Sequence, residues 1–210
     1  MRDLKNNLTP GKNSRNIQSK RIKGFGYQVL GFGAGGRLPR VPGNIDFLVI
    51  AGGGSACGTS NAGGGGAGGY RTATESTVAL EKVITITVGD GGASVSSGVG
   101  NTGIASSFSG SGLTTISSAG GGGGGQDGSR PGKAGGSGGG AGPNGTFGAG
   151  NTPSTSPVQG YNGGAAISSG SWGAGGGGGA SEVGENATSP KAGDGGDGVA
   201  SSISGSSVTR

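Results

Sequence analysis

Glycine runs constrain this chain more than any other feature of its sequence. Six consecutive glycines occupy residues 120–125, five occupy residues 175–179, and glycine makes up 59 of the 210 residues. Each glycine inside an α-helix costs roughly 0.8–1 kcal/mol relative to alanine, so helices are not expected to form through these runs. Hydrophobic residues are only 29% of the chain, well below the ~45–50% of ordinary globular proteins. The chain therefore cannot depend on one broad apolar core.

The glycine-rich stretch also shows a period of three residues. A polyproline-II-type helix has three residues per turn and makes no hydrogen bonds within itself. Its N–H and C=O groups need partners on neighbouring segments, and glycine allows those backbones to approach closely. Such bonds, each worth a net ~0.5–1.5 kcal/mol, would offset the large entropy that glycine loses on folding. The residues with this period are Gly136, Gly139, Gly142, Gly145 and Gly148.

Two alternatives for this stretch are a collagen helix and a disordered Gly/Ser linker. Collagen is disfavoured because the period breaks at Asn151 and because the chain has only 8 prolines. Disorder is disfavoured because single aromatic residues punctuate the glycines at Phe147, Tyr161 and Trp172. We therefore predict an ordered, polyglycine-II-like helix bundle.

Residues 45–119 carry the pattern of short β-strands separated by turns. The clearest strand is VITITV (83–88), whose side chains alternate between two faces. The sequence GDGG (89–92) follows it and is expected to form a hairpin turn, because these residues tolerate positive φ angles. Further strands are expected at 45–51, 69–76, 103–110, 112–119 and 198–210, with a turn around residues 109–112, and another at GYQVLGFG (26–33). The expected core residues are Ile45, Phe47, Val49, Val83, Ile84, Ile86, Val88, Ile104, Phe108 and Ile116.

These signals predict a mainly β and irregular fold with almost no α-helix: short β-strands in a small sheet or sandwich, followed by the polyglycine-II-like bundle. Three parts are expected: a basic extended anchoring arm at 1–44, a β-rich domain at 45–119 and a glycine-rich domain at 120–210. Residues 1–44 hold nine of the 15 Lys and Arg residues and one acidic residue. No secretory signal is expected, and the longest apolar run has five residues, so no membrane span is expected.

No catalytic, cofactor or metal site is predicted. The stretch FLVIAGGGSACG (47–58) resembles a dinucleotide loop, but Cys57 replaces the third glycine and no helix can follow. The chain has no histidine and a single cysteine, so zinc sites and histidine-based catalytic triads cannot come from this chain alone. A repeat-type calcium site near residues 195–200 lacks its aspartate at Ala200, so Asp194 and Asp197 are interpreted as turn residues.

The basic arm is expected to dock the chain onto a larger assembly. A cluster of like charges favours contact with an acidic surface. Nucleic acid is the alternative partner, but sparse aromatic residues and the absence of RGG repeats make it the weaker one. The docking residues are Arg2, Lys5, Lys12, Arg15, Lys20, Arg21 and Lys23.

The order of elements resembles the glycine-rich modules of bacteriophage tail fibres and adhesins. The resemblance covers residues 45–210 and rests on an apolar strand entering AGGG, then GGGGAGGYRT, VITITVGDGG, AGGGGGG and SSISGSSVT. VLGFGAGG (29–36) is also similar to the leaders of such virion proteins. The resemblance implies polyglycine-II packing, host-binding loops, attachment through an N-terminal segment and a homo-oligomer, with a trimer favoured. Related sequences often continue into another glycine block, whereas this one ends at Arg210.

The expected function is that of a non-enzymatic virion structural protein. It would be a tail fibre or fibre-like appendage on the phage particle, docked through residues 1–44 to tail, baseplate or capsid proteins. A second hypothesis is a host-surface adhesin, in which the loop at 151–161 meets a polysaccharide or protein receptor. Tyr161 and Trp172 would then stack on sugar rings rather than serve as packing caps. A capsid-decorating fibre, an extracellular glycine-rich matrix protein and an ice-binding glycine bundle are further hypotheses for a chain of this composition.

Overall fold

The computed structural model describes residues 43–58, 60–78, 82–167 and 173–210. All of them belong to one compact unit, Pro42–Arg210. Several features singled out from the sequence lie outside the described residues. They are the strand expected at 26–33, the aromatic residue Trp172, and the docking residues Arg2, Lys5, Lys12, Arg15, Lys20, Arg21 and Lys23.

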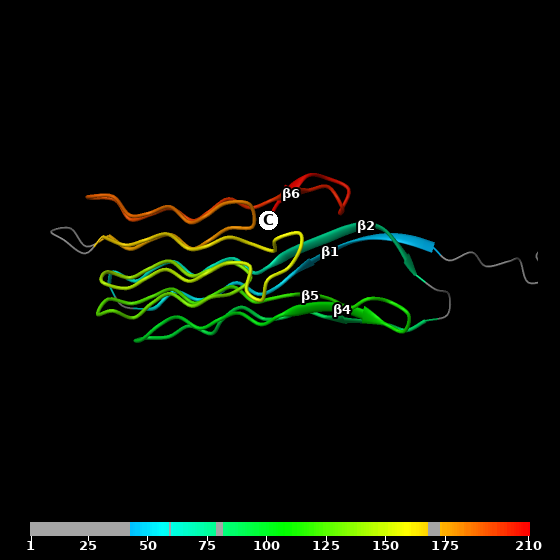
Figure 1. Ribbon diagram of the computed structural model, residues 1–210, viewed down its shortest axis with the longest axis horizontal. Coiled ribbons are helices and arrows are strands. Elements are labelled where there is room, and N and C mark those ends of the chain that lie inside the picture. Colours follow the sequence, from blue (N-terminus) through cyan, green and yellow to red (C-terminus); the bar gives the residue numbers. More distant parts are fainter. Residues whose placement is uncertain (1–42, 59, 79–81, 168–172) are drawn as a thin grey trace, which may run out of the picture. The chain divides into compact units, whose positions relative to one another are not determined.

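The described residues contain short antiparallel strands and no helix, which confirms a mainly β and irregular fold. One sheet pairs β1 with β2, a second has the order β3-β4-β5, and a hairpin pairs β6 with β7. The β1–β2 pair lies against β4 and β5 (Figure 1). The strand bounds are β1 Gly43–Ile50, β2 Tyr70–Val78, β3 Ile84–Thr87, β4 Ser106–Gly110, β5 Ile116–Ser118, β6 Ala200–Ser201 and β7 Val208–Thr209.

A small apolar core lies between the first two sheets. The rings of Phe47 on β1 and Phe108 on β4 stack with their centroids 5.3 Å apart and an interplanar angle of 18°. Val49 and Phe108 are each only 8% exposed. The buried Ser118 on β5 donates its hydroxyl hydrogen to Val49 O at 2.7 Å, which ties the second sheet to β1.

The predicted core is wrong in part, because several of its members lie on the surface. β3 is an edge strand that pairs only with β4, and both of its faces are largely exposed, with only Ile84 half-buried among its four residues. Alternation in the sequence therefore identified the strand but did not reveal that no other sheet of the described residues covers it. The exposed members are Val83 at 80%, Ile86 at 70%, Val88 at 81% and Ile104 at 56% exposure.

The predicted hairpin turn at residues 89–92 is also wrong. The chain runs straight on after β3, turns near Gly98, whose φ is +102°, and returns so that Ile104 donates to Asp90 O at 2.8 Å. A Cβ on Gly92 would overlap the carbonyl oxygen of Asn101. These glycines thus allow another part of the backbone to approach closely, and they do not adopt the positive φ angles of a hairpin turn. The turn expected between β4 and β5 is confirmed at Gly112, with φ +82°.

Most of the remaining chain forms extended segments that are neither helix nor strand, here called the glycine array. These segments run side by side away from the strands, and each joins a strand or a neighbouring segment at its end (Figure 1). Segments from before and after residue 120 are bonded into one array. The array comprises residues 51–56, 62–69, 89–93, 99–105, 119–125, 132–142, 146–150, 159–165, 174–179, 182–187 and 192–198.

Hydrogen bonds between array segments repeat every three residues. The central segment 120–125 donates to different neighbours at successive positions, and all six of its glycines are buried. It also accepts bonds from segments 63–66, 100–103 and 133–136. Main-chain groups thus find their partners on other segments, as buried backbone groups must. The donated bonds are Gly121 to Gly52 O (2.9 Å), Gly124 to Ser55 O (2.9 Å), Gly122 to Ser137 O (2.8 Å) and Gly125 to Gly140 O (2.9 Å).

Backbone packing against backbone forms much of the interior of this unit. A Cβ on Gly122 would overlap the carbonyl oxygen of Lys133, and a Cβ on Gly123 would overlap that of Gly100. Several of the buried side chains are small; Ala141, for example, is fully buried. The glycine runs that prevent helix formation therefore allow the close approach on which this interior depends.

Candidate functional site

The loop at 151–158 is held in a defined shape by one asparagine. Asn151 adopts φ +47°, a conformation that asparagine tolerates better than most residues. Its Oδ1 accepts hydrogen bonds from the backbone N–H and the hydroxyl group of Thr155, both at 3.0 Å. The same hydroxyl lies 2.8 Å from Pro157 O. These contacts fix a loop whose residues 152–154 and 156–158 are exposed.

A buried glutamine fastens this loop to the rest of the unit. Gln159 is 1% exposed. Its Nε2 donates to Pro153 O at 2.7 Å, and its Oε1 accepts from the Ala119 N–H at 2.8 Å. Its backbone carbonyl accepts from the N–H of Tyr70, the first residue of β2, at 2.7 Å. The loop is therefore anchored both to the glycine array and to the β1–β2 sheet.

Beside this loop lies a pocket of about 240 Å³, here called the tyrosine pocket. Tyr161, predicted from the sequence as a receptor contact, lies in its wall, and so does Tyr70, which sequence reasoning missed. Trp172, the other predicted contact, lies outside the described residues. Tyr70 is the first residue of β2, and no sequence pattern around it indicates a binding site. The pocket is lined by Tyr70, Arg71, Thr72, Pro157, Val158, Tyr161, Ala180, Ser181 and Val199.

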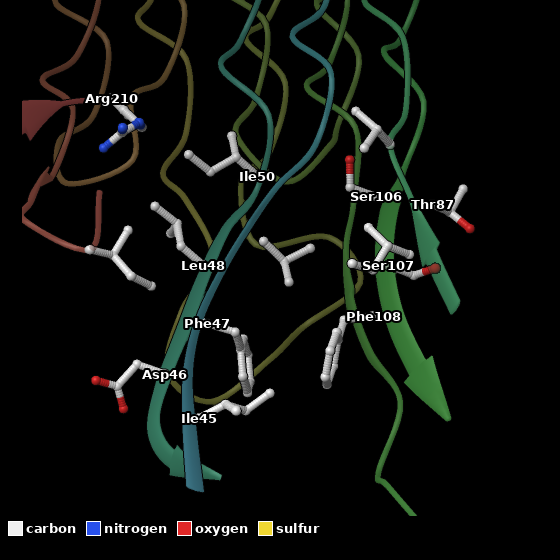
Figure 2. A pocket seen from close by; sticks show the side chains of 14 residues that line it. Ile45, Asp46, Phe47, Leu48, Ile50, Thr87, Ser106, Ser107, Phe108 and Arg210 are labelled. Carbon is white, nitrogen blue, oxygen red and sulfur yellow. The ribbon is translucent and has the colours of Figure 1, made fainter. Parts of the chain in front are cut away.

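A larger apolar groove of about 560 Å³ follows β1. In Figure 2, Phe47 and Phe108 face each other on one side of β1, while Leu48 lies on its opposite side. Asp46 and Arg210 are the ionisable residues among those that line the groove. This groove offers mainly apolar contact area. Its further lining residues are Ile45, Val49, Ile50, Ile86, Thr87, Val88, Ser106, Ser107 and Ile203.

Charged side chains gather at Lys191. Its Nζ lies 2.6 Å from Asp194 Oδ2 and 3.3 Å from Glu185 Oε2, with all three side chains more than half exposed. The hydrogen bond between Lys191 and Asp194 lowers the pKa of Asp194 and raises the pKa of Lys191. Asp194, interpreted from sequence as a turn residue, is thus an ion-pair partner. Across the described ranges, no group of three or more His, Cys, Asp or Glu residues could hold a metal ion.

The loop at 51–58 that resembles a dinucleotide site uses its backbone N–H groups within the protein. Gly52 donates to Ile104 O at 3.0 Å and Gly54 donates to Gly66 O at 2.8 Å. Those N–H groups are therefore not directed at a phosphate. Among the residues with assigned structure, no helix is long and apolar enough to cross a membrane.

A family model described as a glycine-rich domain matches residues 31–209. No curated protein and no solved structure matches the chain.

Proposed function

We propose that this chain, which belongs to the glycine-rich domain family, is a non-enzymatic structural protein of a bacteriophage particle. It serves as a tail fibre or fibre-like appendage. The observation that carries the proposal is the glycine array, in which the buried segment 120–125 exchanges main-chain hydrogen bonds with segments on several sides. Such an interior suits a module that extends along one direction and presents loops, and the order of the chain's elements resembles tail-fibre modules.

In this proposal the array segments are polyglycine-II-type helices. The three-residue interval of the hydrogen bonds supports this assignment, because a helix with three residues per turn returns to the same neighbour at every third residue. The close approach of the backbones supports it too, since only glycine leaves room for a carbonyl at the position of a Cβ.

The basic residues of the arm at 1–44 would dock the fibre to another virion protein, and the fibre would be a homo-oligomer, with a trimer favoured. The proposal is tested by immunogold electron microscopy of purified phage particles with an antibody against residues 43–210. Label on tails or exterior appendages is expected, and unlabelled particles in a preparation that contains the intact gene would contradict it.

Charge reversal at Arg15, Lys20, Arg21 and Lys23 should prevent incorporation of the protein into phage particles, whereas normal incorporation would exclude docking through the arm.

A host-surface adhesin is the second candidate, and one observation favours it. The loop at 151–158 is exposed yet fixed by Asn151 and Gln159, as expected for a surface that recognises a partner without first becoming ordered. Flow cytometry with the labelled full chain on host cells tests this candidate. Saturable binding is expected, and fluorescence no higher than that of an unrelated protein would exclude it.

A further inference from the structure

We propose that the tyrosine pocket binds a single neutral sugar ring of a surface polysaccharide. This inference rests on the second candidate function and assigns a ligand class to one site. The walls of the pocket combine two aromatic rings, Tyr70 and Tyr161, with the apolar surfaces of Pro157 and Val158. A sugar ring presents C–H groups on its faces and hydroxyl groups around its edge, so it suits a wall that is aromatic with polar margins.

The polar groups that such a ligand needs are available. Tyr70 and Tyr161 are both partly exposed, and both line the pocket. A tyrosine hydroxyl can donate one hydrogen bond and accept others. Thr72 and the exposed Ser181 also line the pocket; their hydroxyl groups donate to backbone carbonyl groups, so they can serve a ligand as hydrogen-bond acceptors.

The pocket is fixed before any ligand arrives. Two of its lining residues, Pro157 and Val158, belong to the loop that Asn151 and Gln159 hold in place. The backbone bond from Tyr70 to Gln159 O at 2.7 Å joins the opposite wall to the same loop. Tyr161 is held by its N–H, which donates to Gly179 O at 3.1 Å. A pocket fixed in this way loses little entropy when it binds.

Size restricts the ligand to one ring, and the lining has no acidic group that would favour a positively charged one. The pocket of about 240 Å³ lies below the ~300–1,000 Å³ of pockets for drug-sized ligands. The one cation in the lining, Arg71, directs its Nη1 to Ser117 O at 3.4 Å and keeps further N–H donors that can bond the hydroxyl groups of a ring.

The test is a titration of the full, ¹⁵N-labelled chain with methyl galactoside, methyl glucoside and N-acetylglucosamine, followed by NMR. We expect saturable shifts of the amides of Thr72, Val158 and Tyr161 for at least one sugar, with a Kd on the order of 1 mM. Tyr161→Ala should weaken that binding at least tenfold. Phe147→Ala is the matched control, because Phe147 is 43% exposed and lies outside the pocket, and it should bind as the wild type does.

Val158→Trp gives an independent variant, since Val158 is 49% exposed and a larger side chain there fills the pocket without disturbing the interior. We expect it to abolish sugar binding and to reduce cell binding. The inference is overturned if none of the three sugars gives saturable shifts, if glucuronate binds more tightly than all of them, or if Val158→Trp binds sugar normally. Host-cell binding that persists without sugar binding would exclude the pocket and leave the adhesin function standing.

Discussion

At single positions, glycine serves this fold through its missing Cβ. Gly98 and Gly112 lie in turns with positive φ, but a Cβ there would meet open space. In the array, by contrast, the space beside the glycine is filled: a Cβ on Gly54 would overlap the carbonyl oxygen of Gly122. Glycine is therefore required in the array for packing, and the requirement differs from one residue to the next.

Adjacent glycines in one segment allow a direct test of this requirement. We expect Gly54→Ala to destabilise the protein by at least ~1–3 kcal/mol, the usual cost of overpacking a close-packed interior. Gly53→Ala is the matched control, because the nearest atom to its Cβ would be Gly66 O at 3.6 Å. It should be neutral or stabilising by ~0.4–1 kcal/mol through the lower entropy of the unfolded chain. Urea unfolding of both variants measures the difference, and equal stabilities would contradict this account.

The ion pairs of Lys191 should make a pH-dependent contribution to stability. The hydrogen bond from Lys191 lowers the pKa of Asp194 in the folded protein. This contribution is fully present above the ordinary carboxyl pKa of ~3.9 and is lost as the pH falls through the lowered folded value. The same bond raises the pKa of Lys191, so its contribution is present below the ordinary lysine pKa of ~10.4 and is lost as the pH rises through the raised value.

We therefore expect Lys191→Met to lower the Tm slightly at about pH 7 and not at about pH 2, where the carboxyl groups are largely protonated. The effect should be small and weakened by salt, because the side chains are 51–71% exposed. Thermal unfolding followed by circular dichroism at both pH values provides the measurement. A Tm difference of the same size at the acidic pH would show that the lysine acts through something other than these ion pairs.

At the scale of elements, the sequence predicted where strands form better than what they bury. β-branched residues and alternation located β1 to β5, because these preferences are local. Neither face of β3 is buried, because burial depends on a second sheet packing against a strand, and such contacts join distant parts of the chain. The GDGG sequence at 89–92 could form either a turn or an array segment, since glycine suits both. The hydrogen bonds to the neighbouring residues Gly53 and Ile104 distinguish the two.

The candidate site was predictable only in part for the same reason. An isolated aromatic residue among glycines drew attention to Tyr161, and the polar, proline-containing stretch 151–161 predicted an exposed loop. Tyr70 lies in a strand far away in the sequence, and its N–H donates a hydrogen bond to Gln159 O, which joins β2 to this loop. Docking through the basic arm stays a prediction.

The two stacked phenylalanines should provide the main apolar stabilisation between the sheets. We expect Phe108→Ala to cost ~3–5 kcal/mol, because Phe108 is 8% exposed and stacks on Phe47. Val83→Ala, immediately before β3, should change the stability by less than ~0.5 kcal/mol, because Val83 is 80% exposed. Chemical denaturation of the two variants compares them, and a larger loss for Val83→Ala would show that the exposed residues of the second sheet are in fact covered.

At the scale of the whole compact unit, main-chain hydrogen bonds take the place of a broad apolar core. Exposure of apolar surface raises the heat capacity on unfolding, and exposure of polar surface lowers it. An interior built largely from glycine backbone should therefore give an unusually small change in heat capacity on unfolding. By differential scanning calorimetry we expect a heat-capacity change below the usual ~12–15 cal/mol/K per residue, counted over Pro42–Arg210. A value within or above that range would indicate a conventional core.

The central claim, that array segments are held by bonds between their backbones, is tested most directly by amide hydrogen exchange of the native full chain followed by NMR. The amides of segment 120–125 that donate to neighbouring segments are Gly121, Gly122, Gly124 and Gly125. We expect them to exchange only through global unfolding, as slowly as the amides of the β1–β2 sheet. Exchange of these four amides at the rate of an unstructured chain, while the sheet amides stay protected, would contradict the account.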